Sequence, residues 1–169
     1  MAMDASVDSD WGADVETRRS VTGFVFTANG SPIYWRSKRH TIVALSSGEA
    51  EYVALSSFAR KANWLRKLFF EMNTQSPWQD NIKIPPMPIH VDSTTAISIA
   101  SRDSSTPRTK HIDLKYHHVC DMVQRGIIIF KHVPSWEQMA DGFTKIATES
   151  ILERMVERMV ERLGLNLHV

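Results

Sequence analysis

The sequence predicts an α/β fold around a mixed β-sheet that is antiparallel at its start and parallel later. Two neighbouring segments between residues 20 and 46 show apolar alternation, and Asn29-Gly30 between them is a hairpin turn signal. A long segment from Gly48 to Met72 repeats apolar residues at helical spacing. Strand-like and helix-like segments then alternate, which is typical of parallel strands joined by crossover helices.

The first half of the chain is expected to hold three strands and one long helix. A short apolar run that ends at Asp8 predicts the first strand, which should form an antiparallel meander with the two segments of residues 20–46. At the start of the helix, Ser46 and Glu49 fit a capping box, in which each side chain accepts a hydrogen bond from a free backbone N–H group.

The second half predicts two more strands and several helices. After a proline-rich loop come the strand PIHV, a helix in STTAISIASR, a helix in HIDLKYHHVCDMVQR that Gly126 should end, and the strand IIIFKHV. Ser135 and Gln138 fit a second capping box, for a short helix that carries Asp141.

The domain organisation is expected to be simple. Residues 1–147 should form one domain, and residues 148–169 a C-terminal amphipathic helix and tail. The tail contains a four-residue repeat, ILERMVERMVERLGL, whose apolar residues make one stripe of a helix that Gly164 should end. We favour packing of this helix on the domain over binding of a partner, because the repeat is short for a coiled coil.

Composition and charge exclude several classes of protein. With 43% hydrophobic residues, 23% charged residues and a formal net charge of +1, the chain is an ordinary globule and not a strongly basic domain. Its one cysteine, Cys120, excludes an internal disulfide and a cysteine-rich zinc site. It has no membrane-spanning run and no signal-peptide pattern, so we expect a cytoplasmic or nuclear protein that is not secreted and binds no membrane.

Four acidic residues stand where the predicted elements begin or end. Two close strand-like runs, one falls in the first turns of the long helix and one lies in the last short helix: Asp8, Asp92, Glu51 and Asp141. Gathered in one place they would repel each other, by roughly 4 kcal/mol for a pair at 4 Å and an effective dielectric of 20. Divalent cations with oxygen ligands relieve such repulsion, and a pair of them is suited to phosphodiester cleavage.

Each of these carboxylates also has a simpler use. An aspartate between a strand and a helix, such as Asp92, is commonly an N-cap, and Glu51 would favour the helix dipole. Asp8 is also explained as a turn residue and Asp141 as an exposed helix acid. Asp10 and Asp14 are close in sequence to the first position and are the nearest alternatives for it.

Six segments carry a resemblance to a known family. They are DSDWGAD, RRSVTGFVF, WRSKRHTIVALSSGEAEYVAL, IHVDSTTAISIA, RTKHIDLKYHHV and HVPSWEQMADGFTK. In this order and spacing, over roughly residues 7–165, the chain resembles the ribonuclease H domain of copia-type retrotransposon polyproteins. The resemblance implies a ribonuclease H-like fold, with a five-stranded mixed sheet flanked by helices. It also implies catalytic and metal-binding roles for four residues: Asp8, Glu51, Asp92 and Asp141.

The activity implied by the resemblance is that of a metal-dependent endoribonuclease. It would hydrolyse the RNA strand of RNA–DNA hybrids with two Mg²⁺ ions, or with Mn²⁺ in their place, and a reverse transcriptase domain of the parent polyprotein would be its partner. His132, nine residues before Asp141, is a candidate for moving a proton. Candidates for binding the hybrid are Lys38, Arg39, Arg108, Lys110 and His111.

Two other functions stay open from the sequence. The chain departs from the family pattern in the order of DSDWGAD, in TKIA and in the repeated ERMV, which fits a decaying or domesticated element. Such a remnant would be catalytically silent and would act at most as a nucleic-acid-binding or protein-binding module. A DNA-cleaving integrase or transposase of the same general fold is weaker, since those enzymes usually use three carboxylates and the flanking motifs differ.

Overall fold

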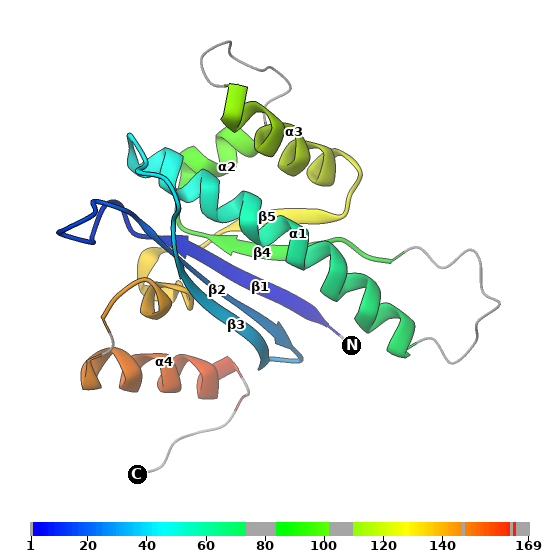
Figure 1. Cartoon of the computed structure of the whole chain (residues 1–169). Coiled ribbons are helices and arrows are strands. Elements are labelled where there is room, and N and C mark those ends of the chain that lie inside the picture. The colour runs from blue at the N-terminus through cyan, green and yellow to red at the C-terminus, as the bar shows by residue number, and fades with distance from the viewer. Residues whose placement is uncertain (1, 74–83, 102–109, 147, 163, 165–169) are drawn as a thin grey trace.

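A single five-stranded mixed sheet organises the molecule (Figure 1). A computed structural model of the chain describes residues 2–73, 84–101, 110–146, 148–162 and 164. The strands are β1 (Met3–Ser9), β2 (Val21–Ala28), β3 (Ser31–Arg39), β4 (Met87–Val91) and β5 (Ile128–His132), in the spatial order β3-β2-β1-β4-β5. The helices are α1 (Ser47–Asn73), α2 (Thr94–Ala100), α3 (Lys110–Gln124) and α4 (Glu149–Arg162). Two 3₁₀ turns complete the list, η1 (Ser135–Glu137) and η2 (Asp141–Phe143).

The antiparallel half is the predicted meander. β2 pairs antiparallel with both β1 and β3, and the hairpin turns at Asn29 and Gly30, whose φ angles are 50° and 83°. The third strand ends at Arg39, earlier than predicted. Arg39 pairs with Val21, the first residue of β2, so the residues after it have no strand to pair with.

In the parallel half of the sheet, β4 pairs with β1 over a short stretch only. β4 runs parallel to both β1 and β5. It pairs with β1 only at Ala5↔Ile89 and Ser6↔His90, so the two strands part where their C-terminal ends approach the acidic residues. This gap is the feature of the fold that matters most for the site.

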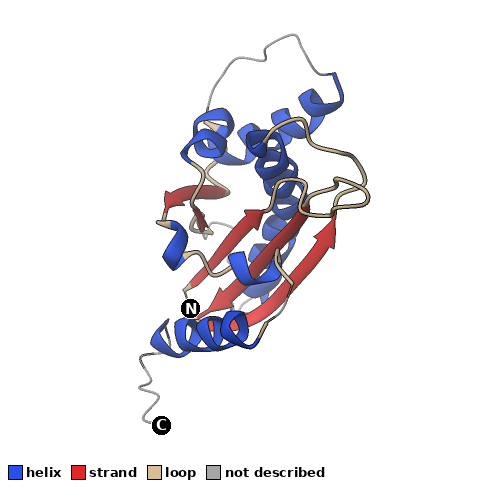
Figure 2. Ribbon diagram, turned by 90° about the vertical axis from the view of Figure 1, so that its left-hand side faces the viewer, coloured by secondary structure: helices blue, strands red, loops and turns tan. Residues whose placement is uncertain are grey.

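Helices cover both faces of the sheet. α1, α2 and α3 lie on one face and α4 on the other (Figures 1 and 2). The main core lies under α1, where the rings of Phe26 and Phe58 stack at 4.6 Å between centroids. On the opposite face, α4 packs against the sheet and η2, as favoured from the sequence, and the Arg158 guanidinium donates to the carbonyl of Gln138 at 2.8 Å. None of the described helices is long and apolar enough to cross a membrane.

The helix ends confirm two of the sequence signals and contradict a third. Ser46 Oγ accepts a hydrogen bond from the Glu49 backbone N–H at 3.1 Å, and the Glu49 carboxylate accepts one from a backbone N–H one residue before Ser46. Gly126, with φ 62°, ends α3 as expected. The predicted capping box of Ser135 and Gln138 is wrong. The Ser135 side chain bonds to Asp92 and that of Gln138 to Val7, and the segment forms two separate 3₁₀ turns instead of a helix.

Candidate functional site

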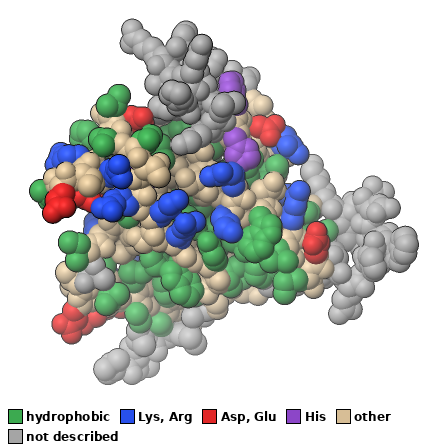
Figure 3. Space-filling view, viewed as in Figure 1, with side chains coloured by type: hydrophobic (Ala, Val, Ile, Leu, Met, Phe, Trp, Pro, Cys, Tyr) green, Lys and Arg blue, Asp and Glu red, His purple; other side chains and the backbone are tan. Residues whose placement is uncertain are grey.

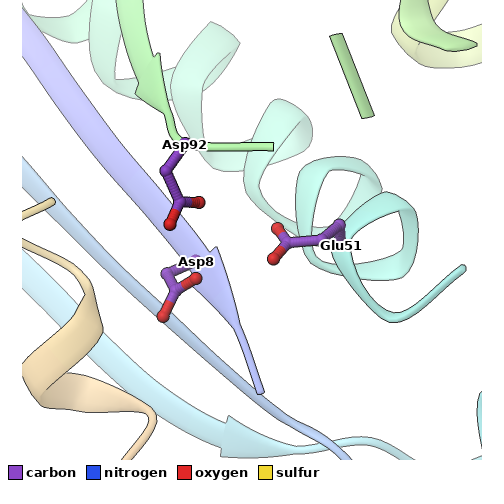
Figure 4. Close-up of side chains that lie close together, drawn as sticks. All are labelled: Asp8, Glu51 and Asp92. Atoms are coloured by element: carbon purple, nitrogen blue, oxygen red, sulfur yellow. The ribbon is translucent and has the colours of Figure 1, made fainter. Parts of the chain in front are cut away.

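Three carboxylates meet at one end of the sheet. Asp8, Glu51 and Asp92 each offer an oxygen atom, and these atoms all lie within 4.8 Å of one another (Figure 4). The three side chains come from β1, from the first turns of α1 and from the residue that follows β4. The structure thus brings together three of the four acidic residues singled out in the sequence.

Asp92 is free for this cluster because its neighbour caps the next helix. Ser93 Oγ accepts a hydrogen bond from the Ala96 backbone N–H at 3.1 Å, which is the N-cap contact of α2. Asp92 therefore does not cap α2, and its carboxylate instead accepts a hydrogen bond from Ser135 Oγ at 2.9 Å. Ser135 belongs to η1, so this contact fixes the turn after β5 against the end of β4.

Glu51 has an oxygen atom with no hydrogen-bond partner. The residue is 8% exposed, and its Oε2 is buried and has no partner in the described structure. Burial, followed by the charges of Asp8 and Asp92, raises the pKa of Glu51 to about 9. A buried oxygen without a partner is costly, and a cation bound here would remove that cost.

Asp8 is held in a similar environment. Burial, then the charge of Asp92, raises its pKa to about 6, while a hydrogen bond of 3.0 Å from Thr144 Oγ1 opposes the shift. The cluster offers only carboxylate oxygens, which suits a hard cation such as Mg²⁺ or Mn²⁺ better than zinc. The residues present therefore fit the metals that the sequence resemblance implies.

Asp141 lies beside the cluster and outside it. Its carboxylate forms an ion pair with Lys145 at 2.6 Å. It is still close enough to Asp8 for its charge to raise the pKa of Asp8. Thr144 joins the two, since its Oγ1 lies 3.0 Å from the Asp8 carboxylate and 2.9 Å from the Asp141 carbonyl.

Gln138 spans the gap between β1 and β4. Its fully buried side chain donates from Nε2 to the carbonyl of Val7 at 3.0 Å and to the carbonyl of His90 at 3.3 Å. Its Oε1 accepts from the backbone N–H of Ala140 at 3.3 Å. These three partners lie within two residues of Asp8, Asp92 and Asp141, so one side chain fixes three acidic positions. The sequence pattern around Gln138 predicted a helix cap and gave no sign of this role.

Gly23 lets η2 approach Asp8. It pairs directly with Asp8 across the β1–β2 ladder. A Cβ atom at Gly23 would lie 2.7 Å from the Ala140 carbonyl oxygen, 2.8 Å from Phe143 Cβ and 2.9 Å from Thr144 Cγ2. Only glycine therefore allows this turn to lie against the sheet at the level of Asp8.

Asp10 and Asp14, the alternatives to Asp8 in the sequence, form hydrogen bonds and an ion pair elsewhere. Asp10 accepts a hydrogen bond from the Val21 backbone N–H at 2.8 Å. Asp14 accepts from the backbone N–H of Thr17 at 2.9 Å and forms an ion pair with Arg39 at 2.5 Å. Neither belongs to the three-carboxylate cluster found among the described residues.

The remaining candidates are spread over the molecule. His132 is exposed at the end of β5, where its backbone pairs with Val91, the residue before Asp92. Lys38 and Arg39 lie on β3, two strands away from β1. Three of the predicted hybrid-binding side chains lie outside the described residues: Arg108, Lys110 and His111.

The chain is similar in sequence to polyproteins of plant transposons. It is 32% identical over 146 residues to the retrovirus-related Pol polyprotein from transposon TNT 1-94 of Nicotiana tabacum. It is 31% identical over 145 residues to that from transposon RE2 of Arabidopsis thaliana. The chain is a homologue of copia-type Pol polyproteins. Each match covers 86% of this chain and 10% of the relative, so the chain spans about a tenth of their length. No protein-family model matches it.

The fold of this Pol homologue is that of ribonucleases H. Its structure matches LC11-RNase H1, isolated from compost by a metagenomic approach, with a TM-score of 0.61 and 16% identity over 89% of this chain and 98% of the other. The same protein in complex with an RNA/DNA hybrid gives a TM-score of 0.55 at 16% identity, over 89% of this chain and 99% of the other. The ribonuclease H fold implied by the sequence motifs is confirmed.

Proposed function

We propose that this chain is an endoribonuclease that hydrolyses the RNA strand of RNA–DNA hybrids with divalent cations. The observation that carries the proposal is the cluster of Asp8, Glu51 and Asp92, whose oxygen atoms lie within 4.8 Å of one another. The homology to Pol polyproteins and the likeness to a ribonuclease H that binds a hybrid support the choice of substrate. Carboxylates placed this closely in a partly buried site are suited to holding cations that bind phosphate oxygens.

The chain's own residues have distinct tasks in this proposal. Asp8, Glu51 and Asp92 would hold the metals, and Asp141 would be the fourth ligand once its ion pair with Lys145 opens. Such a site would hold two Mg²⁺ ions, or Mn²⁺ in their place, which would supply activation of the attacking water and stabilisation of the leaving 3′-oxygen.

Neighbouring side chains orient the ligands and assist the chemistry. Ser135 and Thr144 hold the carboxylates of Asp92 and Asp8 through hydrogen bonds of 2.9 and 3.0 Å. We assign His132, exposed after β5, to carrying a proton to or from solvent.

The proposal extends to the surroundings of the site. We assign residues 1–147 to the nuclease unit and residues 148–169 to an accessory helix and tail, of which the structure describes α4. Because the chain spans 10% of its relatives, a reverse transcriptase domain of the parent polyprotein is proposed as the partner that presents the hybrid. Lys110 and His111 on α3, with the preceding Arg108, are proposed to contact that hybrid.

A cleavage assay tests the proposal. The purified chain is incubated with a hybrid labelled on both strands, with Mg²⁺ or Mn²⁺, beside Asp92→Asn and the control Asp121→Asn, which changes an exposed α3 carboxylate paired with Arg125. We expect cleavage of the RNA strand alone, abolished by EDTA and by Asp92→Asn and unchanged in the control. If protein that melts cooperatively leaves the hybrid intact with both metals, the chain is a catalytically silent remnant. Cleavage of duplex DNA would establish an integrase-like enzyme.

A further inference from the structure

A groove of about 400 Å³ lies between β3 and α1, away from the carboxylate cluster. Its walls contain five lysine and arginine side chains and no aspartate or glutamate. Figure 3 shows basic side chains gathered across the middle of this face of the molecule. The basic lining residues are Arg36, Lys38, Arg39, Arg60 and Lys61.

Most of this positive charge is not neutralised. Arg39 forms an ion pair with Asp14 at 2.5 Å. Within the described residues, no carboxylate lies within ion-pair distance of Arg36, Lys38 or Arg60. Ser56 and Ser57 also line the groove, as does Thr22, whose hydroxyl group is already hydrogen-bonded to His40 Nε2 at 2.6 Å. Cations and hydroxyl donors without competing acids make a surface suited to phosphate groups.

The groove and Asp8 lie on opposite faces of the sheet. Thr22 and Phe24 line the groove, whereas Gly23 between them pairs with Asp8 and faces η2. Neighbouring residues of a strand point to opposite faces, so the Asp8 side chain points away from the groove. Glu51 belongs to α1, which is also a wall of the groove, but none of the three cluster residues lines it. The groove and the carboxylate cluster therefore share no lining residue.

An exposed aromatic ring adjoins the cations. Trp64 on α1 is 52% exposed, and the Lys61 ammonium lies 4.7 Å from the centroid of its ring. The same ammonium lies 5.5 Å from the ring centroid of Tyr34 on β3, so Lys61 joins the two walls. A basic groove beside an exposed aromatic ring is the arrangement that holds single-stranded nucleic acid, whose unstacked bases can stack on the ring.

We propose that this groove binds the phosphate backbone of single-stranded nucleic acid, with a base stacked on Trp64. Arg36, Lys38 and Arg60 contact the phosphates. An acidic peptide would use the cations but would leave the aromatic ring unused, so the nucleic acid is the better occupant. This binding is independent of the nuclease activity proposed above and requires no metal.

Fluorescence anisotropy in EDTA tests the groove. The probe is a labelled oligothymidylate strand, titrated with the wild-type chain and with the double variant Arg36→Glu/Arg60→Glu. We expect at least tenfold weaker binding by the variant, and a slope of log affinity against log salt that is smaller by about 1.4, or roughly 0.7 for each lost contact. Trp64→Ala should weaken binding about tenfold, because stacking of one base is lost.

The control reverses two charges elsewhere. Lys131→Glu/Arg154→Glu changes an exposed residue of β5, the other edge strand, and one of α4. It should bind like the wild type. Equal loss in both double variants would overturn the proposal, as would tighter binding of a polyglutamate peptide than of the oligonucleotide. The neutral pair Arg36→Gln/Arg60→Gln, with thermal melting of every variant, separates lost binding from lost folding.

The two proposals fail separately. Binding is measured without metal, where no cleavage occurs, and cleavage is measured on the hybrid. Loss of hybrid cleavage in Asp92→Asn with unchanged oligonucleotide binding would support both assignments. If the chain binds the single strand but does not cleave the hybrid, the groove proposal stands and the nuclease proposal is contradicted. If the chain cleaves the hybrid but binds no oligonucleotide in EDTA, the nuclease proposal stands and the groove proposal is contradicted.

Discussion

The side-chain amide of Gln138 lies 3.0 Å from the backbone carbonyl of Val7, which immediately precedes Asp8. The same amide nitrogen reaches the carbonyl of His90, two residues before Asp92. The last pair of the β1–β4 ladder is Ser6↔His90, so Gln138 bridges the two strands at the point where their ladder ends. Gln138 thus keeps the strands apart and still pairs their buried acceptors, which leaves room for a metal between the two aspartates.

Replacing Gln138 by methionine should damage both the fold and the site. Gln138→Met keeps the shape but leaves two buried carbonyls and one buried N–H without that partner, so we expect a loss on the order of 3 kcal/mol in the free energy of unfolding. Mn²⁺ affinity, measured by calorimetry below the melting temperature, should fall as well. The matched control is Gln124→Met, on the exposed C-terminal end of α3. Unchanged metal affinity in Gln138→Met would contradict the positioning role.

A methyl group at position 23 should displace the turn that carries Asp141. In Gly23→Ala, the new Cβ would lie 2.7 Å from the Ala140 carbonyl oxygen, so η2 must move away from Asp8. We expect the melting temperature to fall and RNA-strand cleavage to drop at least tenfold. Gly48→Ala is the control, since its Cβ meets Thr95 Cγ2 at an ordinary 3.5 Å. Equal melting temperatures and equal cleavage rates of the two variants would contradict a role for the close approach of η2 to Gly23.

Removing the Glu51 charge should stabilise the metal-free protein. Its pKa is raised from 4.5 to about 9, so between these values the folded chain keeps a proton that the unfolded chain has lost. Stability therefore falls as pH rises through this window, and Glu51→Gln abolishes the fall. In EDTA, the increase in the free energy of unfolding of Glu51→Gln over the wild type should be absent below pH 4 and on the order of 2 kcal/mol at pH 7. Urea unfolding at several pH values measures it, and a gain that does not vary with pH would refute the explanation.

Metal binding should release protons. At pH 7, Glu51 with a pKa of about 9 carries a proton that a metal ion must displace, whereas Asp8 with a pKa of about 6 is mostly ionised. Mn²⁺ titrated by calorimetry in buffers of different ionisation enthalpy should release about one proton per site. Affinity should rise up to about tenfold per pH unit between pH 7 and 9. Affinity that is constant over this range would contradict the raised pKa.

The carboxylate cluster was largely predictable because short-range signals surround it. Glu49 fits the helix cap, which leaves Glu51 free, and Ser93 supplies an N-cap directly after Asp92. The hairpin at Asn29 and Gly30 fixes the register of β2 and β3 in the same local way. These interactions act over a few residues, so the sequence pattern is sufficient to find them.

Other parts of the site depend on contacts between distant segments. Gln138 and Val7 are 131 positions apart, and the need for glycine at Gly23 arises only once η2 lies on the sheet. The ion pair between Asp141 and Lys145 also follows from how residues 141–145 turn. The unpaired cations of the groove depend on which face of β3 each residue takes, which a one-residue change of register would reverse.

Gln138 is bonded by Arg158 of α4, so the parts of the site are synthesised in a fixed order. Asp8, Glu51 and Asp92 all precede Gln138 in the sequence, so a growing chain contains the carboxylate cluster before it contains Gln138. Gln138, which separates their strands, comes much later, and its carbonyl is bonded by Arg158 near the end of the last helix. A nascent chain therefore carries the acids before it carries the parts that space them. The carboxylate site is completed only when α4, which carries Arg158, has left the ribosome.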